Sequence, residues 1–191
     1  MEKVDVKTII YNAFTRMFAS ERGSGLTFRD KWDKYHWISQ DIHQNQVQYN
    51  CFYGEEINPC YFGLNLEFKS TWEALSRADS AALQDELRNL PNDYFFEAYW
   101  EEVPRRVFKP APPIGTIPRG PAPANKLNIG QFINQVMEGK ENDRPDARWQ
   151  PHLMLYATLS QGDENLTVNE YLQRMRSIRE HLSAIETLIT V

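Results

Sequence analysis

The sequence predicts a single α+β domain, with a mixed or antiparallel sheet of about five strands flanked by helices. Three observations support this. Stretches in which every second residue is apolar, typical of strands, are interspersed with stretches of helical period. A length of 191 residues suits one domain, and 41% hydrophobic and 13% aromatic residues suffice for a core. We expect an α-β-β-β-α-β core over 1–103, a proline-rich basic arm over 104–126, and a helix-strand-helix over 127–191 that completes the core.

The first elements follow from the spacing of apolar residues. Residues 5–20 carry them at helical spacing and predict an amphipathic helix. The dense charges of 29–34 are typical of a loop. Alternation then predicts strands over 35–42 and 47–53, joined by a turn at 44–45.

The segment 59–72, PCYFGLNLEFKSTW, is the clearest strand signal in the chain. Its strict alternation predicts a strand in the middle of the sheet with one buried and one polar face. The buried face would carry Phe62, Leu64, Leu66 and Phe68, and the polar face Asn65, Glu67 and Lys69. Ser70 and Glu73 have the spacing of a capping box, so we expect a helix from 70 to 90. An aromatic-rich strand over 94–100 would follow.

A basic arm interrupts this pattern. Seven prolines between 104 and 123 predict an extended loop or polyproline II structure, because proline cannot donate a backbone hydrogen bond. The overall net charge is −5, yet the window 103–137 contains no acidic residue. Its basic residues include Arg105, Arg106, Lys109 and Arg119, which would suit contacts with phosphate groups.

The remaining elements complete the predicted domain. A short helix is expected after Asn128, then a polar loop over 138–148 and a fifth strand over 152–159. Thr167 is followed three residues later by a glutamate, so a capped amphipathic helix is expected to run to the C-terminal end.

Several kinds of site and location are disfavoured by composition. No apolar run approaches the roughly 20 residues of a membrane span, and the first residues lack the apolar segment of a signal peptide. We therefore expect a cytoplasmic protein without membrane contact. Cys51 and Cys60 are too few for a disulfide framework or a zinc site, and we expect reduced thiols. Neither a phosphate-binding glycine loop nor a serine-hydrolase motif is present.

The α-β-β-β-α-β order, with Glu67-x-Lys69 on the third strand, resembles the core of the PD-(D/E)xK restriction-endonuclease-like superfamily over residues 5–100. The resemblance implies a Mg²⁺-dependent nuclease. In it Asp41 and Glu67 would hold the metal, and Lys69 would assist the charge that develops in the reaction. Without that activity we expect no cofactor.

Three functional hypotheses follow. The leading one is a nucleic-acid-binding module of a prokaryotic restriction or defence type, which holds the phosphates of DNA or RNA with the basic arm. Its sheet would stack aromatic rings on bases, the candidates being Trp37, Tyr49, Tyr61 and Trp100. The first alternative is the Mg²⁺-dependent nuclease. The second is a non-enzymatic adaptor that docks a protein partner through the arm or the last helix.

Overall fold

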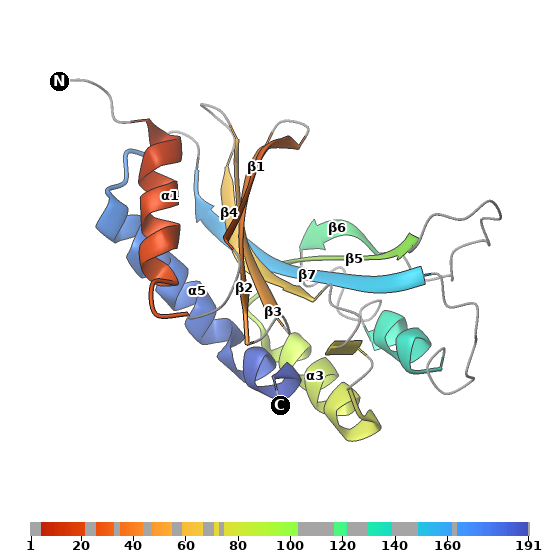
Figure 1. Cartoon of the computed structure of the whole chain (residues 1–191). Coiled ribbons are helices and arrows are strands. Elements are labelled where there is room, and N and C mark those ends of the chain that lie inside the picture. Colours follow the sequence, from red (N-terminus) through yellow and green to blue (C-terminus); the bar gives the residue numbers. More distant parts are fainter. Residues whose placement is uncertain are drawn as a thin grey trace.

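A computed structural model of the chain gives the observed architecture (Figure 1). It describes residues 5–21, 26–32, 35–43, 47–54, 59–66, 71–72, 75–102, 117–121, 130–138, 149–161 and 164–190. These residues form one α+β domain, as expected. Within the described part of the chain, none of the helices combines the length and the apolar character that a bilayer crossing needs.

The described strands form a single antiparallel sheet of seven strands in the order β1-β2-β3-β4-β7-β5-β6. The first four are consecutive along the chain. The last strand in sequence, β7, lies between β4 and β5, and so joins the two halves of the sheet. The strands are β1 (Leu26–Trp32), β2 (Tyr35–Ile42), β3 (Val47–Gly54), β4 (Cys60–Leu66), β5 (Phe95–Glu102), β6 (Ile117–Pro121) and β7 (Trp149–Ser160).

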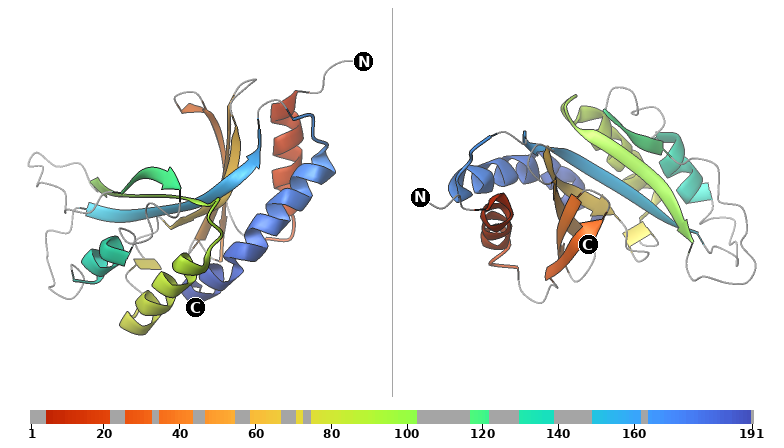
Figure 2. Two further views of the ribbon diagram at one scale, coloured as in Figure 1. Left: turned by 180° about the vertical axis from the view of Figure 1, so that it is seen from behind. Right: turned by 90° about the horizontal axis from the view of Figure 1, so that it is seen from above.

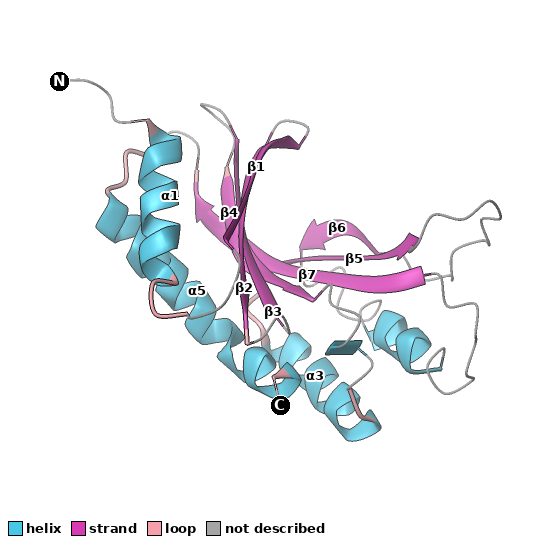
Figure 3. Ribbon diagram, viewed as in Figure 1, coloured by secondary structure: helices cyan, strands magenta, loops and turns pink. Residues whose placement is uncertain are grey.

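The described helices lie on one face of this sheet, which we call the helical face (Figure 3). They are α1 (Val6–Met17), α3 (Arg77–Asn89), α5 (Val168–Ile189) and a helical segment over 130–138. The long helix α5 contacts α1, α3, β4 and β7 (Figure 2). Its N-terminus is fixed by the capping box of Thr167 and Glu170, as the sequence predicted.

Two hydrophobic clusters occupy the two faces of the sheet. The large one lies on the helical face, where alternate strand residues such as Ile38, Phe62 and Leu155 pack under α1 and α5. The smaller one is mostly aromatic and lies on the opposite face, which we call the aromatic face. No described helix covers the aromatic face.

Four local expectations are corrected. Residues 26–32 form the edge strand β1, whereas a loop had been expected from the charges of 29–34. Except at Tyr61, β4 is buried on both faces, whereas one polar face had been expected: Asn65 is only 1% exposed.

The third correction concerns the helix expected over 70–90, which is not continuous. Residues 71–72 are helical, but 75–76 are not, and α3 begins after Ser76, whose side chain and that of Asp79 form a capping box. The expected capping box of Ser70 and Glu73 lies outside the described residues. The fourth concerns the proline-rich arm. Part of it, β6, is a strand, and this is compatible with its prolines because β6 lies at the edge of the sheet.

Gly63 lies where the two halves of the sheet meet. It pairs with Tyr156 of β7, and a Cβ added at Gly63 would lie 1.9 Å from the carbonyl oxygen of Leu155. That space is occupied by backbone, so no side chain fits there. The close approach accompanies a strong change of direction between β4 and β7 (Figure 1).

We predict that Gly63→Ala destabilises the fold by about 3 kcal/mol or more, because the backbone of β7 must move to admit the methyl group. Urea denaturation followed by circular dichroism measures this. Gly130→Ala is the matched control, since among the described residues its Cβ would meet the flexible side chain of Gln84, at 3.1 Å from the amide oxygen, and no backbone atom. Its effect should stay within about 1 kcal/mol of zero. Equal stability of the two variants would contradict this account of Gly63.

Candidate functional site

The aromatic face carries five rings from five adjacent strands. Trp37 lies against Phe52 with ring centroids 4.7 Å apart, and Phe52 meets Tyr156 edge-on at 5.5 Å. Tyr61 approaches Tyr156 at 5.3 Å, and Phe95 stacks on Tyr156 at 5.6 Å with only 8° between the planes. The rings therefore form a continuous cluster across β2, β3, β4, β7 and β5.

The rings of this cluster differ in exposure. Phe52 and Tyr156 are buried, whereas Trp37, Tyr61 and Phe95 remain partly exposed. Partly exposed rings held by buried neighbours present a fixed apolar surface. Planar groups such as nucleobases stack on surfaces of this kind, and the interaction depends little on base sequence.

A row of polar side chains lies beside the rings. Asn65 donates from Nδ2 to Oε1 of Gln48 at 3.3 Å, and Gln48 donates from Nε2 to Oδ1 of Asp41 at 2.8 Å. The three residues are direct cross-strand neighbours on β4, β3 and β2. Asp41 thus lies on the aromatic face, with its carboxylate held by a neighbouring amide.

The structure separates the aromatic residues that the sequence singled out. Trp37 and Tyr61 both belong to the aromatic face. Tyr49 lies on the helical face with no exposed surface, its ring against Phe62 and Phe18. The expectation that Tyr49 stacks on a base is therefore wrong, because both of its faces are covered. Trp100 has its backbone in β5, and its side chain lies outside the described residues.

Most of the expected charged site residues also lie outside the described part of the chain. These are Glu67, Lys69, Arg105, Arg106 and Lys109, together with the side chain of Arg119. The residues that are described include no group of three or more His, Cys, Asp or Glu placed to hold a metal. The expected Mg²⁺ pair of Asp41 and Glu67 includes a residue outside the described part of the chain.

Three members of the aromatic cluster were not identified from the sequence: Phe52, Phe95 and Tyr156. Each lies in a segment that was predicted to be a strand, or at its border. Alternation indicates that Phe52 shares a face with Asn50, but not which other rings lie on that face. The missing information was the pairing of β7 with both β4 and β5, which brings Tyr156 between Tyr61 and Phe95.

No family model, curated protein or solved structure matches this chain.

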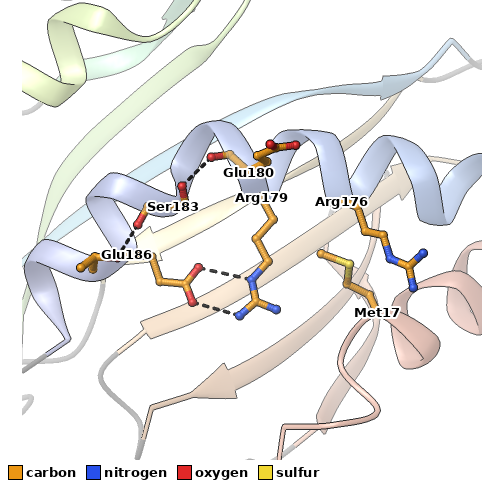
Figure 4. Close-up of a pocket in the computed structure, with 7 residues that line it drawn as sticks. Met17, Arg176, Arg179, Glu180, Ser183 and Glu186 are labelled. Carbon is orange, nitrogen blue, oxygen red and sulfur yellow. Dashed lines mark hydrogen bonds and ion pairs between the residues drawn. The ribbon is translucent and has the colours of Figure 1, made fainter.

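A second concentration of polar groups lies between α1 and α5, around a hollow of about 410 Å³ (Figure 4). At its centre Arg179 donates from Nε and Nη2 to the two carboxylate oxygens of Glu186, at 3.3 and 2.9 Å. Arg179 also donates to Glu21, and its guanidinium lies 5.1 Å from the ring centroid of Tyr49. The hollow is lined by Met17 of α1 and by residues of α5.

Glu186 receives further hydrogen bonds from the sheet. The Tyr49 hydroxyl donates to Oε2 at 2.5 Å, and Nε2 of His43 lies 2.8 Å from Oε1. His43 reaches this position from the end of β2 with a left-handed backbone conformation, φ 51°. Every oxygen of the carboxylate therefore already has protein partners, and we interpret this ionic cluster as a link between α5 and the sheet.

The ionisation of the cluster follows from its geometry. Burial alone would raise the pKa of Glu186, but hydrogen bonds from Arg179, Tyr49 and His43 outweigh it and hold that pKa below its ordinary value. Burial raises the pKa of the Tyr49 phenol well above its ordinary value, and the neighbouring Glu186 carboxylate adds to the effect. At neutral pH Glu186 is thus charged and Tyr49 is a neutral donor.

We predict that Glu186→Gln lowers the free energy of unfolding at neutral pH by about 1–3 kcal/mol, because Arg179 loses its principal ionic partner. The folded-state pKa of Glu186 is below the ordinary value of 4.5, so this stabilisation is complete above that pH. It is lost as the pH falls through the folded-state pKa. The difference between wild type and variant should therefore shrink in acid.

Urea denaturation at about pH 7 and about pH 3 measures both effects. Glu180→Gln is the control, since Glu180 is an exposed residue of α5 that lines the same hollow. It should change stability by no more than about 0.5 kcal/mol. A Glu186→Gln variant as stable as Glu180→Gln at neutral pH would refute the role given to the ionic cluster.

Proposed function

We propose that the protein binds single-stranded nucleic acid on the aromatic face of its sheet. The observation that supports this most strongly is the set of partly exposed rings, Trp37, Tyr61 and Phe95, fixed by buried rings on a face that carries no described helix. Base stacking needs rings that are both accessible and rigid. Sheets use such rings to hold single strands, whose bases are not stacked within a duplex.

The position of β6 supports the same proposal. This strand belongs to the basic segment 103–137, and it pairs with β5 at the edge of the sheet. Pro121 of β6 is the direct cross-strand neighbour of Phe95, one of the exposed rings. The basic segment is therefore anchored beside the aromatic cluster, and in the proposal its arginines and lysine contact the phosphates of a strand whose bases lie on the rings.

We predict that Trp37→Leu and Tyr61→Leu each weaken binding of a single-stranded oligonucleotide by about tenfold or more, the usual effect of losing one stacked base. Leucine keeps apolar contact with Phe52, so the fold should persist. Fluorescence anisotropy with a labelled ten-nucleotide probe gives the affinities, and circular dichroism checks folding.

Tyr11→Leu is the control for these variants. Tyr11 is an exposed aromatic residue, 39% accessible, on α1 and therefore on the other side of the domain. Its replacement should leave the affinity unchanged. If the wild type binds single strands and the Trp37 and Tyr61 variants bind equally well, the aromatic face is not the binding surface.

We further predict that alanine at Arg105, Arg106, Lys109 and Arg119 together weakens binding and flattens its dependence on salt. Each phosphate contact with a single strand contributes about 0.7 to the slope of log K against log salt concentration, so four contacts would lower the slope by about 3. Titrations between about 50 and 200 mM salt measure it. An unchanged slope would remove these residues from the interface.

A metal-dependent nuclease is a second candidate. Asp41 lies on the same face of the sheet as Asn65. Asn65 precedes Glu67 by two residues in the sequence, the spacing of residues that share a face of a strand. In that proposal Asp41 and Glu67 bind Mg²⁺ next to a strand held on the rings, and Lys69 assists. Incubating the bound oligonucleotide with Mg²⁺ distinguishes binding alone from cleavage.

A further inference from the structure

The side chain of Asn50 is a buried amide to which the described part of the chain offers no hydrogen-bond partner. Asn50 lies in β3 and is 2% exposed. Neither its Oδ1 nor its Nδ2 has a hydrogen-bond partner among the described residues. A carboxamide has two donor hydrogens and an acceptor oxygen, so all of this capacity is unused.

Such a group lowers the stability of the fold. A buried donor or acceptor without a partner loses its hydration on folding, which costs about 1–3 kcal/mol of folding free energy. A leucine of similar size would avoid this cost. Buried polar groups are rarely left in this state unless something else uses them. The amide of Gln48, two residues earlier on the same face of β3, is by contrast engaged with Asp41 and Asn65.

The surroundings of Asn50 indicate what could use it. It lies on the aromatic face, where its cross-strand neighbours are the small residues Ser39 of β2 and Gly63 of β4. Phe52 is two residues along the same strand, and its cross-strand neighbours are Trp37 and Tyr61. The carboxamide is therefore diagonal to the two partly exposed rings, within reach of a group stacked on either.

We infer that Asn50 is the specificity-determining residue of the aromatic face, and that it reads the edge of an adenine stacked on Trp37 or Tyr61. A carboxamide is complementary to adenine, since Nδ2 donates to the N7 acceptor while Oδ1 accepts from the N6 amino group. This inference rests on the proposed binding of single strands and adds the base that is preferred. The hydrogen bonds to the base replace the solvation that the amide lost on folding.

The test compares labelled ten-nucleotide oligo(dA) and oligo(dT) binding to wild type and to Asn50→Leu by anisotropy. Wild type should prefer oligo(dA) by about tenfold, within the range that one bidentate base contact provides. In Asn50→Leu the preference should fall to within about twofold, with binding of oligo(dT) retained because stacking remains. The variant should be at least as thermally stable as wild type, because it removes an unpaired buried amide.

Ser39→Ala is the control: it changes a buried polar group opposite Asn50 but leaves the carboxamide in place. It should keep the preference for oligo(dA). If wild type binds both oligonucleotides equally, or if Asn50→Leu keeps the preference, the role of Asn50 is refuted while the proposed function stands. If wild type binds neither oligonucleotide, the proposed function fails and this inference fails with it. An unfolded Asn50→Leu variant would also count against it, since it would mean that the amide stabilises the fold.

Discussion

The contact between β4 and β7 at Gly63 is the constraint on which the rest of the domain depends. It joins the meander β1–β4 to the pair β5–β6, and it does so at backbone distance, so neither strand can move away without separating the halves of the sheet. The aromatic face spans this junction, since Tyr61 lies on one side of it and Tyr156 on the other. A platform made from five strands is therefore continuous only because one residue in its middle lacks a side chain.

The helical face is held by different means. Its apolar cluster gains stability from burial, which is not directional. The hydrogen bonds that Glu186 receives from Arg179, Tyr49 and His43 are directional, and they fix how α5 lies across the strands. Each of those four residues is committed to a partner within the fold. The two faces therefore differ in what their polar groups do. On the helical face the charged groups near α5 position a helix. The partly exposed rings and the amide of Asn50, which has no partner among the described residues, lie on the aromatic face.

Local patterns in the sequence predicted much of the fold. Alternation gave the bounds of β2, and the capping box gave the start of α5, because both signals lie within a few neighbouring residues. The sequence could not show that β7 inserts beside β4, since pairing between distant strands leaves no local mark. For the same reason Tyr49 was assigned to the wrong surface: alternation tells which residues share a face, but not which face the helices cover. Trp37 and Tyr61 were identified because aromatic residues on predicted strands are conspicuous, whereas Asn50 was not, since an amide reveals its lack of partners only in three dimensions.

The order of strands also has a consequence for the nascent chain. β4 acquires its neighbour β7 only after residues 149–160 have left the ribosome, so the meander β1–β4 is made long before its second edge is covered. During that interval β4 is an open edge strand with apolar side chains, a state in which strands of other molecules can pair with it. Contacts between segments so far apart in sequence also form slowly. We therefore expect the partly synthesised domain to depend on chaperones that the folded domain no longer needs.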